Sequence, residues 1–237
     1  MVKVAVAQIE IFDNIEKNID KILKFIKKAS KKKADIVCFP ESTLGDKILN
    51  IDSQEIKNIQ NKCNEYSIYC IIGAHIRDRG RIYNSAILIN RDGNIEYVYK
   101  KRHLFPGLDL KETIPGNRNK IIKTDFGKIG IIICWDFAFP ETIKKLSEKG
   151  AQIIFCPSYL LNEAEITKEV FRSYPLIRAF ENNVYFISCD AFTDEVLGES
   201  YICSPLKIMN KIKNRAGIIC SELELQYLED LKKSFDN

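Results

Sequence analysis

Three residues with reactive side chains each stand at the end of an apolar run in this sequence. Glu41 ends the run IVCFPE, Lys101 ends IEYVYKK and Cys134 ends IGIIIC. A carboxylate, an ammonium and a thiol are sufficient for acyl transfer, because the thiol can attack a carbonyl, the carboxylate can take its proton and the ammonium can stabilise the oxyanion. The ammonium and a nearby helix start would also lower the pKa of the thiol, so we expect Cys134 to be the most reactive of the eight cysteines.

Each of these residues also has an interpretation without chemistry. Glu41 could begin a surface loop, Lys101 lies in a basic cluster that could be solvated, and Cys134 could be core, since free cysteine is among the most buried side chains. Taken singly, each residue favours that interpretation, but the three together with their flanking residues favour a site. Lys100 and Lys101 face opposite sides of a strand, so only one of them can point into it.

The segments that would position these residues alternate between strand and helix patterns. Apolar runs predict strands at residues 1–10, 34–39, 69–76, 81–90, 94–101, 128–134, 151–158, 183–190, 200–205 and 216–225. Helical patterns follow at residues 15–26, 53–66, 140–150, 163–182 and 226–233, and Asp13 with Glu16 resembles a capping box for the first. There is no repeat, low-complexity tract or linker, so we expect one α/β domain over residues 1–237, with the site at the carboxyl ends of strands.

Composition limits the partners and the location. The 237 residues carry a net charge of +4, which gives no reason to expect binding to nucleic acid or to a membrane. The amino terminus lacks the features of a signal peptide, and no apolar run approaches the ~20 residues of a membrane span. The eight cysteines form no C-x-x-C pair and there are two histidines, which argues against a structural zinc site. We expect a cytoplasmic protein with reduced thiols.

The residues around the three reactive side chains carry a family resemblance. FPES at 39–42, YKKRHLF at 99–105 and CWDFAFPE at 134–141 resemble the three signature segments of the nitrilase superfamily, the carbon–nitrogen hydrolases. The family patterns are roughly F-P-E, Y-x-K-x-H-L-F and C-[YWF]-D-x-R-F-P-E, and here they occur in the same order and spacing. A lone F-P-E would occur by chance, but three ordered motifs form a specific signal, and the resemblance covers nearly the whole chain.

The resemblance implies a fold, a mechanism and an assembly. The implied fold is a four-layer α-β-β-α sandwich, and the implied roles are general base for Glu41, catalytic lysine for Lys101 and nucleophile for Cys134. The Trp135 backbone N–H would help Lys101 hold the oxyanion before water hydrolyses the thioester. The family chemistry uses no metal or organic cofactor. Family members usually form dimers or larger oligomers, so we expect a homodimer, with the amphipathic helix at 140–150 as the candidate contact.

Other site residues are less defined, and one position departs from the family pattern. Ala138 occupies the usual arginine position of the third motif. The family's second glutamate lies in the loop before PGN, where Glu112 is the first choice and Asp109 the alternative. Trp135 and Tyr159 are candidate walls of the substrate pocket because they lie next to catalytic positions, although core packing explains aromatic residues there at least as well.

The predicted function is hydrolysis of a non-peptide C–N bond in a small molecule through a cysteine thioester. A linear amide, such as an ω-amide of a dicarboxylic acid, or an N-carbamoyl amine is a more probable substrate than a nitrile, which one branch of the family hydrolyses. Two alternatives stay open. A cysteine–histidine hydrolase would need His75 or His103 as its base, and a nitrilase-like protein without catalysis would serve as a binding or assembly module.

Overall fold

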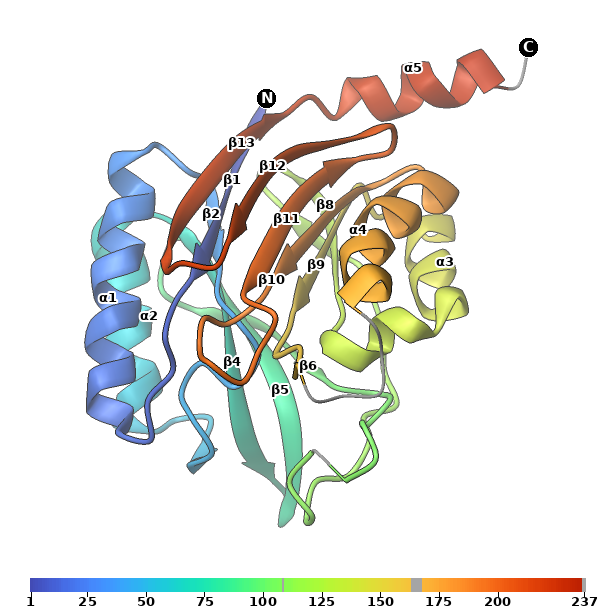
Figure 1. Cartoon of the computed structure of the whole chain (residues 1–237). Coiled ribbons are helices and arrows are strands. Elements are labelled where there is room, and N and C mark those ends of the chain that lie inside the picture. Colours follow the sequence, from blue (N-terminus) through green and yellow to red (C-terminus); the bar gives the residue numbers. More distant parts are fainter. Residues whose placement is uncertain (108, 163–167, 236–237) are drawn as a thin grey trace.

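Two β-sheets face each other between two layers of helices, which makes the predicted four-layer α-β-β-α sandwich (Figure 1). The computed structural model describes residues 1–107, 109–162 and 168–235. Within these ranges, no helix combines the length and apolar character that crossing a bilayer requires.

The first sheet carries two of the three predicted catalytic residues just beyond the carboxyl ends of two of its strands. Its strands run in the order β13-β1-β2-β4-β5-β6, and β3 pairs with β4. β2 is parallel to β4, and two antiparallel steps lead from β4 through β5 to β6. The carboxyl ends of β2 and β6 therefore lie at the same end of the sheet. The strands are β1 Val2–Gln8, β2 Ile36–Cys38, β3 Ile48–Asn50, β4 Tyr69–Asp78, β5 Arg81–Ile89, β6 Ile95–Lys100 and β13 Gly217–Leu223.

The second sheet carries the cysteine. Its strands run in the order β12-β11-β10-β9-β8-β7, with β8, β9 and β10 parallel to one another. These three strands hold the most continuous apolar runs, as strands buried on both faces require. The strands are β7 Ile122–Thr124, β8 Gly127–Ile131, β9 Ile153–Pro157, β10 Tyr185–Cys189, β11 Glu199–Ser204 and β12 Lys207–Lys213.

α1 to α4 cover the outer faces of the two sheets, and α5 extends outward from the end of β13, as Figure 1 shows. α1 and α2 lie on the first sheet, and α3 and α4 lie on the second. α1 begins one residue later than the predicted capping box requires: its N-cap is Asn14, whose side chain accepts a hydrogen bond from the Lys17 N–H at 2.8 Å. The helices are α1 Ile15–Lys31, α2 Gln54–Tyr66, α3 Pro140–Glu148, α4 Lys168–Asn182 and α5 Gln226–Phe235.

The apolar face of α3 is not available to a partner. Ile143 and Leu146 are fully buried, and Leu146 packs on β8, where a Cβ added to Gly130 would lie 2.8 Å from its side chain. The prediction that this amphipathic helix makes the dimer contact through its apolar face is therefore wrong. The helical spacing of Ile143 and Leu146 instead reflects their packing in the core of the same chain.

One core joins the two sheets. Side chains such as Val4 and Ile36 of the first sheet belong to the same buried cluster as Ile131 and Phe155 of the second. A second cluster fills the space between the first sheet and α1 and α2. Burial of each large aliphatic side chain contributes ~1.5–3 kcal/mol, so this shared core holds the two sheets firmly against each other.

Candidate active site

Glu41 lies in a turn that follows β2 by three residues. Its side chain is buried, and its backbone N–H donates to the Ser158 carbonyl of the facing sheet at 3.3 Å. Gly73 of β4 makes room for this turn, because a Cβ there would lie 2.5 Å from the Ser42 nitrogen and 2.6 Å from the Pro40 oxygen. The close approach of β4 to the turn fixes the position of the carboxylate.

Lys101 follows β6 directly and points between the sheets. Its Nζ lies 2.9 Å from Glu41 Oε1 and 2.9 Å from Asp109 Oδ2, and the residue is 2% exposed. Lys100 points the other way, where its Nζ lies 2.6 Å from Asp78 Oδ2 and above the Tyr83 ring. The strand alternation therefore selects Lys101, as predicted, as the lysine that enters the site.

The second carboxylate of the site is Asp109. Besides the Lys101 ammonium, Asp109 Oδ2 accepts the Phe105 N–H at 2.7 Å. Glu112, which the sequence favoured, is exposed to solvent. The preference for Glu112 is thus corrected to Asp109, the alternative, because the turn that starts at Phe105 brings the chain back to the lysine four residues later.

Asn84 of β5 contacts Glu41, Asp109 and the backbone of Lys101. Its Nδ2 donates to Glu41 Oε1 and to Asp109 Oδ1, each at 2.8 Å, and its carbonyl accepts the Lys101 N–H at 2.8 Å. The residue is 3% exposed, and its Oδ1 is buried without a partner. The Nδ2 group of Asn84 therefore holds Glu41 and Asp109 in place beside the Lys101 ammonium.

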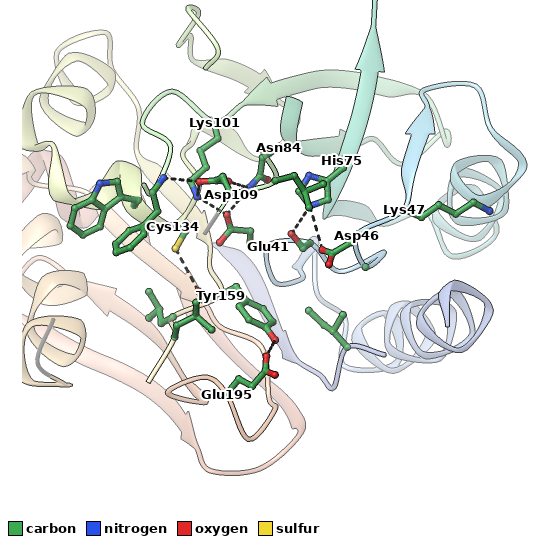
Figure 2. Close-up of a pocket in the computed structure, with 18 of the residues that line it drawn as sticks. Glu41, Asp46, Lys47, His75, Asn84, Lys101, Asp109, Cys134, Tyr159 and Glu195 are labelled. Carbon is green, nitrogen blue, oxygen red and sulfur yellow. Dashed lines mark hydrogen bonds and ion pairs between the residues drawn. The ribbon is translucent and has the colours of Figure 1, made fainter. Parts of the chain in front are cut away.

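Cys134 follows β8 and opens a short 3-10 helix, η1, at Cys134–Ala138. Its backbone has φ 41°, in the left-handed region that a residue with a side chain seldom adopts. The Sγ lies 3.9 Å from the Tyr159 carbonyl oxygen, its acceptor. The sharp change from strand to helix directs the thiol into the space between the sheets, near Lys101 and Glu41 (Figure 2).

Asp136 holds the strained turn in place and explains the third residue of the CWD motif. This fully buried carboxylate accepts the Ile133 N–H at 3.0 Å, the Tyr99 hydroxyl at 2.7 Å and the His103 N–H at 2.9 Å. The second and third motifs therefore meet at Asp136. A network of this kind stabilises a backbone conformation that would otherwise be unfavourable.

Burial and the neighbouring charges keep Cys134 a neutral thiol. Burial raises the pKa of Cys134 well above its ordinary value, the Glu41 carboxylate raises it further, and the Lys101 ammonium offsets only part of this. The expectation that Lys101 lowers the pKa of this thiol below that of an ordinary cysteine is therefore wrong. Burial lowers the pKa of Lys101, but the charges of Glu41 and Asp109 outweigh burial, and the net pKa is raised.

A pocket of about 550 Å³ opens onto these side chains. Trp135 and Tyr159 both line it, together with Phe105, which contacts Trp135 edge to face at a centroid distance of 4.7 Å. The Tyr159 hydroxyl donates to Glu195 Oε2 at 3.1 Å at the rim of the pocket. The two aromatic residues thus occupy the positions predicted for pocket walls.

The histidines do not act as a base for Cys134 in this arrangement. His103 Nδ1 contacts Asp136 Oδ1 at 2.8 Å, and His75 Nε2 contacts Ser42 Oγ at 3.2 Å. The carboxylate of Glu41 is the basic group whose charge acts on the thiol. The cysteine–histidine alternative therefore has no support in the geometry.

Sequence patterns could have found two further residues of the site. Asn84 shares a strand face with the apolar Ala86 and Leu88, and His75 shares one with Ile71. A lone polar residue on an apolar strand face indicates a buried polar contact. Asp136 gives no such signal, because its role depends on the turn that follows β8.

A family model described as carbon-nitrogen hydrolase matches residues 3–233 of the chain. The chain belongs to the carbon–nitrogen hydrolase family. This carbon–nitrogen hydrolase is 28% identical to omega-amidase NIT2 of Xenopus tropicalis, over 91% of its own length and 86% of the relative's. It is 32% identical to a protein named nitrilase from Pyrococcus abyssi, over 95% of its own length and 90% of the relative's.

The fold of this carbon–nitrogen hydrolase matches a solved structure as well. A crystal structure of a carbon-nitrogen hydrolase from Helicobacter pylori G27 superposes with a TM-score of 0.90 at 21% identity, over 99% of this chain and 93% of that one. The predictions of the family, of the sandwich fold and of an enzyme that hydrolyses C–N bonds are confirmed. An interpretation as a protein without catalysis is not needed.

Proposed function

We propose that this carbon–nitrogen hydrolase cleaves small linear amides, with Cys134 as nucleophile, Glu41 as general base and Lys101 as oxyanion donor. The observation that carries the proposal is the buried Glu41–Lys101–Asp109 cluster beside the Cys134 thiol in one pocket. The similarity to a relative named omega-amidase supports an amide as substrate.

In the first half-reaction, Cys134 Sγ bonds to the amide carbon while its proton passes to Glu41. The Glu41 hydrogen bonds from Lys101 and Asn84 both end on Oε1, which keeps Oε2 for that proton among the contacts that the structure describes. Negative charge develops on the carbonyl oxygen next to the Lys101 ammonium. The Trp135 N–H, in the first turn of η1 where N–H groups lack helical partners, supplies a second donor.

In the second half-reaction, the proton on Glu41 passes to the leaving nitrogen, the C–N bond breaks, and ammonia or an amine departs from a Cys134 thioester. Glu41 then takes a proton from water, whose oxygen bonds to the thioester carbon. The C–S bond breaks, and the proton returns to Cys134. Glu41 acts in both halves of the reaction. Two donors hold its Oε1, so Oε2 stays in position to accept the proton and to return it.

The proposal is tested by ammonia release from a panel of small amides, N-carbamoyl amines and nitriles. We expect turnover of amides by the wild type and loss of at least 10³-fold in kcat for Cys134→Ala and Glu41→Gln. Intact-mass analysis should show an acyl adduct on Cys134. Turnover by Cys134→Ala would contradict the proposal, and turnover of nitriles alone would assign the chain the activity named for its Pyrococcus relative.

We also propose that the enzyme is a homodimer in the cytoplasm and that residues 1–237 form one domain. All eight cysteines are free thiols, which suits a reducing compartment. Exposed apolar residues on α4 offer a dimer surface, since Val170, Ile177 and Phe180 are 47%, 49% and 58% exposed. Cell fractionation tests the location, and a single cooperative unfolding transition tests the domain.

A further inference from the structure

We propose, on the basis of the proposed amide hydrolysis, that the pocket selects substrates whose end remote from the scissile bond carries a cation, such as an ammonium group. Amides that end in a carboxylate would be poor substrates. Three properties of the pocket favour such substrates: its lysines are already paired, its outer part carries carboxylates, and it contains a buried polar acceptor without a partner.

The lysines that line the described part of the pocket are both engaged. Lys101 is buried between Glu41 and Asp109, so its charge is already compensated. Lys47 pairs with Glu55 at 2.9 Å, and Figure 2 shows its side chain extending away from the catalytic groups. No arginine is among the described lining residues. A substrate carboxylate would have to compete with Glu55 for Lys47, or with Glu41 and Asp109 for Lys101.

The outer part of the pocket is acidic. Asp13, Asp46 and Glu195 line it, and among the described residues none of them forms an ion pair with a lysine or arginine. The contact of Asp46 is His75 Nε2 at 3.8 Å, and burial lowers the pKa of His75 below its ordinary value, so the imidazole is neutral at pH 7. The three carboxylates therefore act together on a ligand that enters the pocket.

A buried atom of the pocket without a partner favours the same kind of ligand. Asn84 is 3% exposed and lines the pocket, and its Oδ1 lacks a partner. The side-chain orientation is set by the two hydrogen bonds that Nδ2 donates to Glu41 and Asp109, so the remaining atom is the Oδ1 acceptor. It requires a donor, which the N–H groups of an ammonium or carbamoyl group supply and a carboxylate does not.

The test compares three amides of similar length: 5-aminopentanamide as the cation, pentanamide as the neutral form and glutaramate as the anion. We expect kcat/KM at low ionic strength to be highest for the cation and at least tenfold lower for the anion, and the difference to decrease with added salt. In Asp46→Asn combined with Glu195→Gln, the ratio of cation to anion should fall toward one through KM. Glu148→Gln, an exposed carboxylate of α3 outside the pocket, is the matched control and should keep the ratio.

A preference for glutaramate, or an unchanged ratio in the double variant, would overturn the inference while leaving amide hydrolysis intact. Binding is measured separately by isothermal titration calorimetry. We expect 1,4-diaminobutane to bind and succinate not to bind. Binding of succinate alone would overturn the inference. Failure to hydrolyse any of the three amides would instead contradict the proposed function.

Discussion

In this site the reactive sulfur and the positive charge belong to two residues, because Cys134 is a neutral thiol and Lys101 is a charged ammonium. The thiol stays protonated in the resting enzyme because burial and Glu41 raise its pKa, and the lysine keeps its charge because two carboxylates surround it. In the proposed mechanism the nucleophile is therefore produced only when substrate is present and Glu41 takes the proton. Such an arrangement protects the thiol from adventitious oxidation, which requires a thiolate.

Replacement of Lys101 by arginine should fail nearly as badly as replacement by alanine. The buried space beside Glu41 and Asp109 fits a compact ammonium, whereas a guanidinium is a wide planar fork. We expect kcat to fall ~10²–10³-fold for both variants. Lys100→Ala, whose lysine pairs with Asp78 on the outside, should keep nearly full kcat. A collapse confined to Lys100→Ala would contradict this assignment.

Asn84 should act as a positioning residue for the two carboxylates. Asn84→Ala removes both hydrogen bonds that hold Glu41 and Asp109, and Asn84→Asp places a third carboxylate beside them, so we expect both variants to lower kcat per folded enzyme, with the larger loss in Asn84→Asp. Steady-state kinetics on active-site-titrated enzyme measures the loss. A smaller yield of folded enzyme with an unchanged kcat per active site would indicate that Asn84 has only a structural role.

Among the elements, α4 is tied to the second sheet by a buried carboxylate. Glu199 of β11 accepts hydrogen bonds from Arg172 of α4 at 2.8 Å and pairs with Lys213 of β12 at 2.7 Å. Burial raises the pKa of Glu199, but the hydrogen bonds from Arg172, Lys213 and Tyr201 outweigh burial and lower it to about 2. The folded pKa lies below the ordinary one, so this stabilisation is present at neutral pH and is lost as pH falls from about 4.5 to 2.

Replacement of Glu199 by glutamine should therefore change how stability depends on acid. We expect the variant to lose ~1–3 kcal/mol of unfolding free energy at pH 7, because Arg172 and Lys213 lose their shared partner. Between pH 5 and 2.5 the variant should lose less stability than the wild type. Denaturant unfolding at a series of pH values measures both effects. Glu148→Gln, at an exposed end of α3, is the control and should follow the wild type.

The sequence predicted the elements with long apolar runs and missed those without them. β2, β8 and β9 lie in buried apolar runs and were predicted, whereas β12 is largely exposed and the short strands β3 and β7 each have a single buried residue. Apolar runs also distinguish the site residues that the sequence predicted directly from Asp109, which it gave only as an alternative. Glu41, Lys101 and Cys134 follow apolar runs, but Asp109 depends on the path of a loop, which no residue pattern specifies. The part of the predicted helix at 163–167 lies outside the described residues.

For the molecule as a whole, α4 provides the surface for the proposed dimer. Val170, Ile177 and Phe180 lie at positions i, i+7 and i+10, which share one side of a helix. We expect light scattering to give a dimer mass at micromolar concentration, and the combination Ile177→Lys with Phe180→Lys to give a monomer. Leu206→Lys, a change of an apolar residue that is 51% exposed beyond β11, should remain dimeric. A wild-type monomer would contradict the proposal.

The pairing of β13 with β1 has a consequence for how the protein is made. β1 precedes the other strands of this fold along the chain, and β13, its antiparallel partner from Val2 with Leu223 to Gln8 with Gly217, follows them. Until β13 has been synthesised, one edge of β1 exposes unpaired backbone groups that can capture another nascent chain. Chains stopped at Arg215 should therefore aggregate, whereas chains stopped at Leu225, which keep β13, should stay in the supernatant after centrifugation. Chaperones that hold nascent chains would then serve this enzyme until β13 emerges.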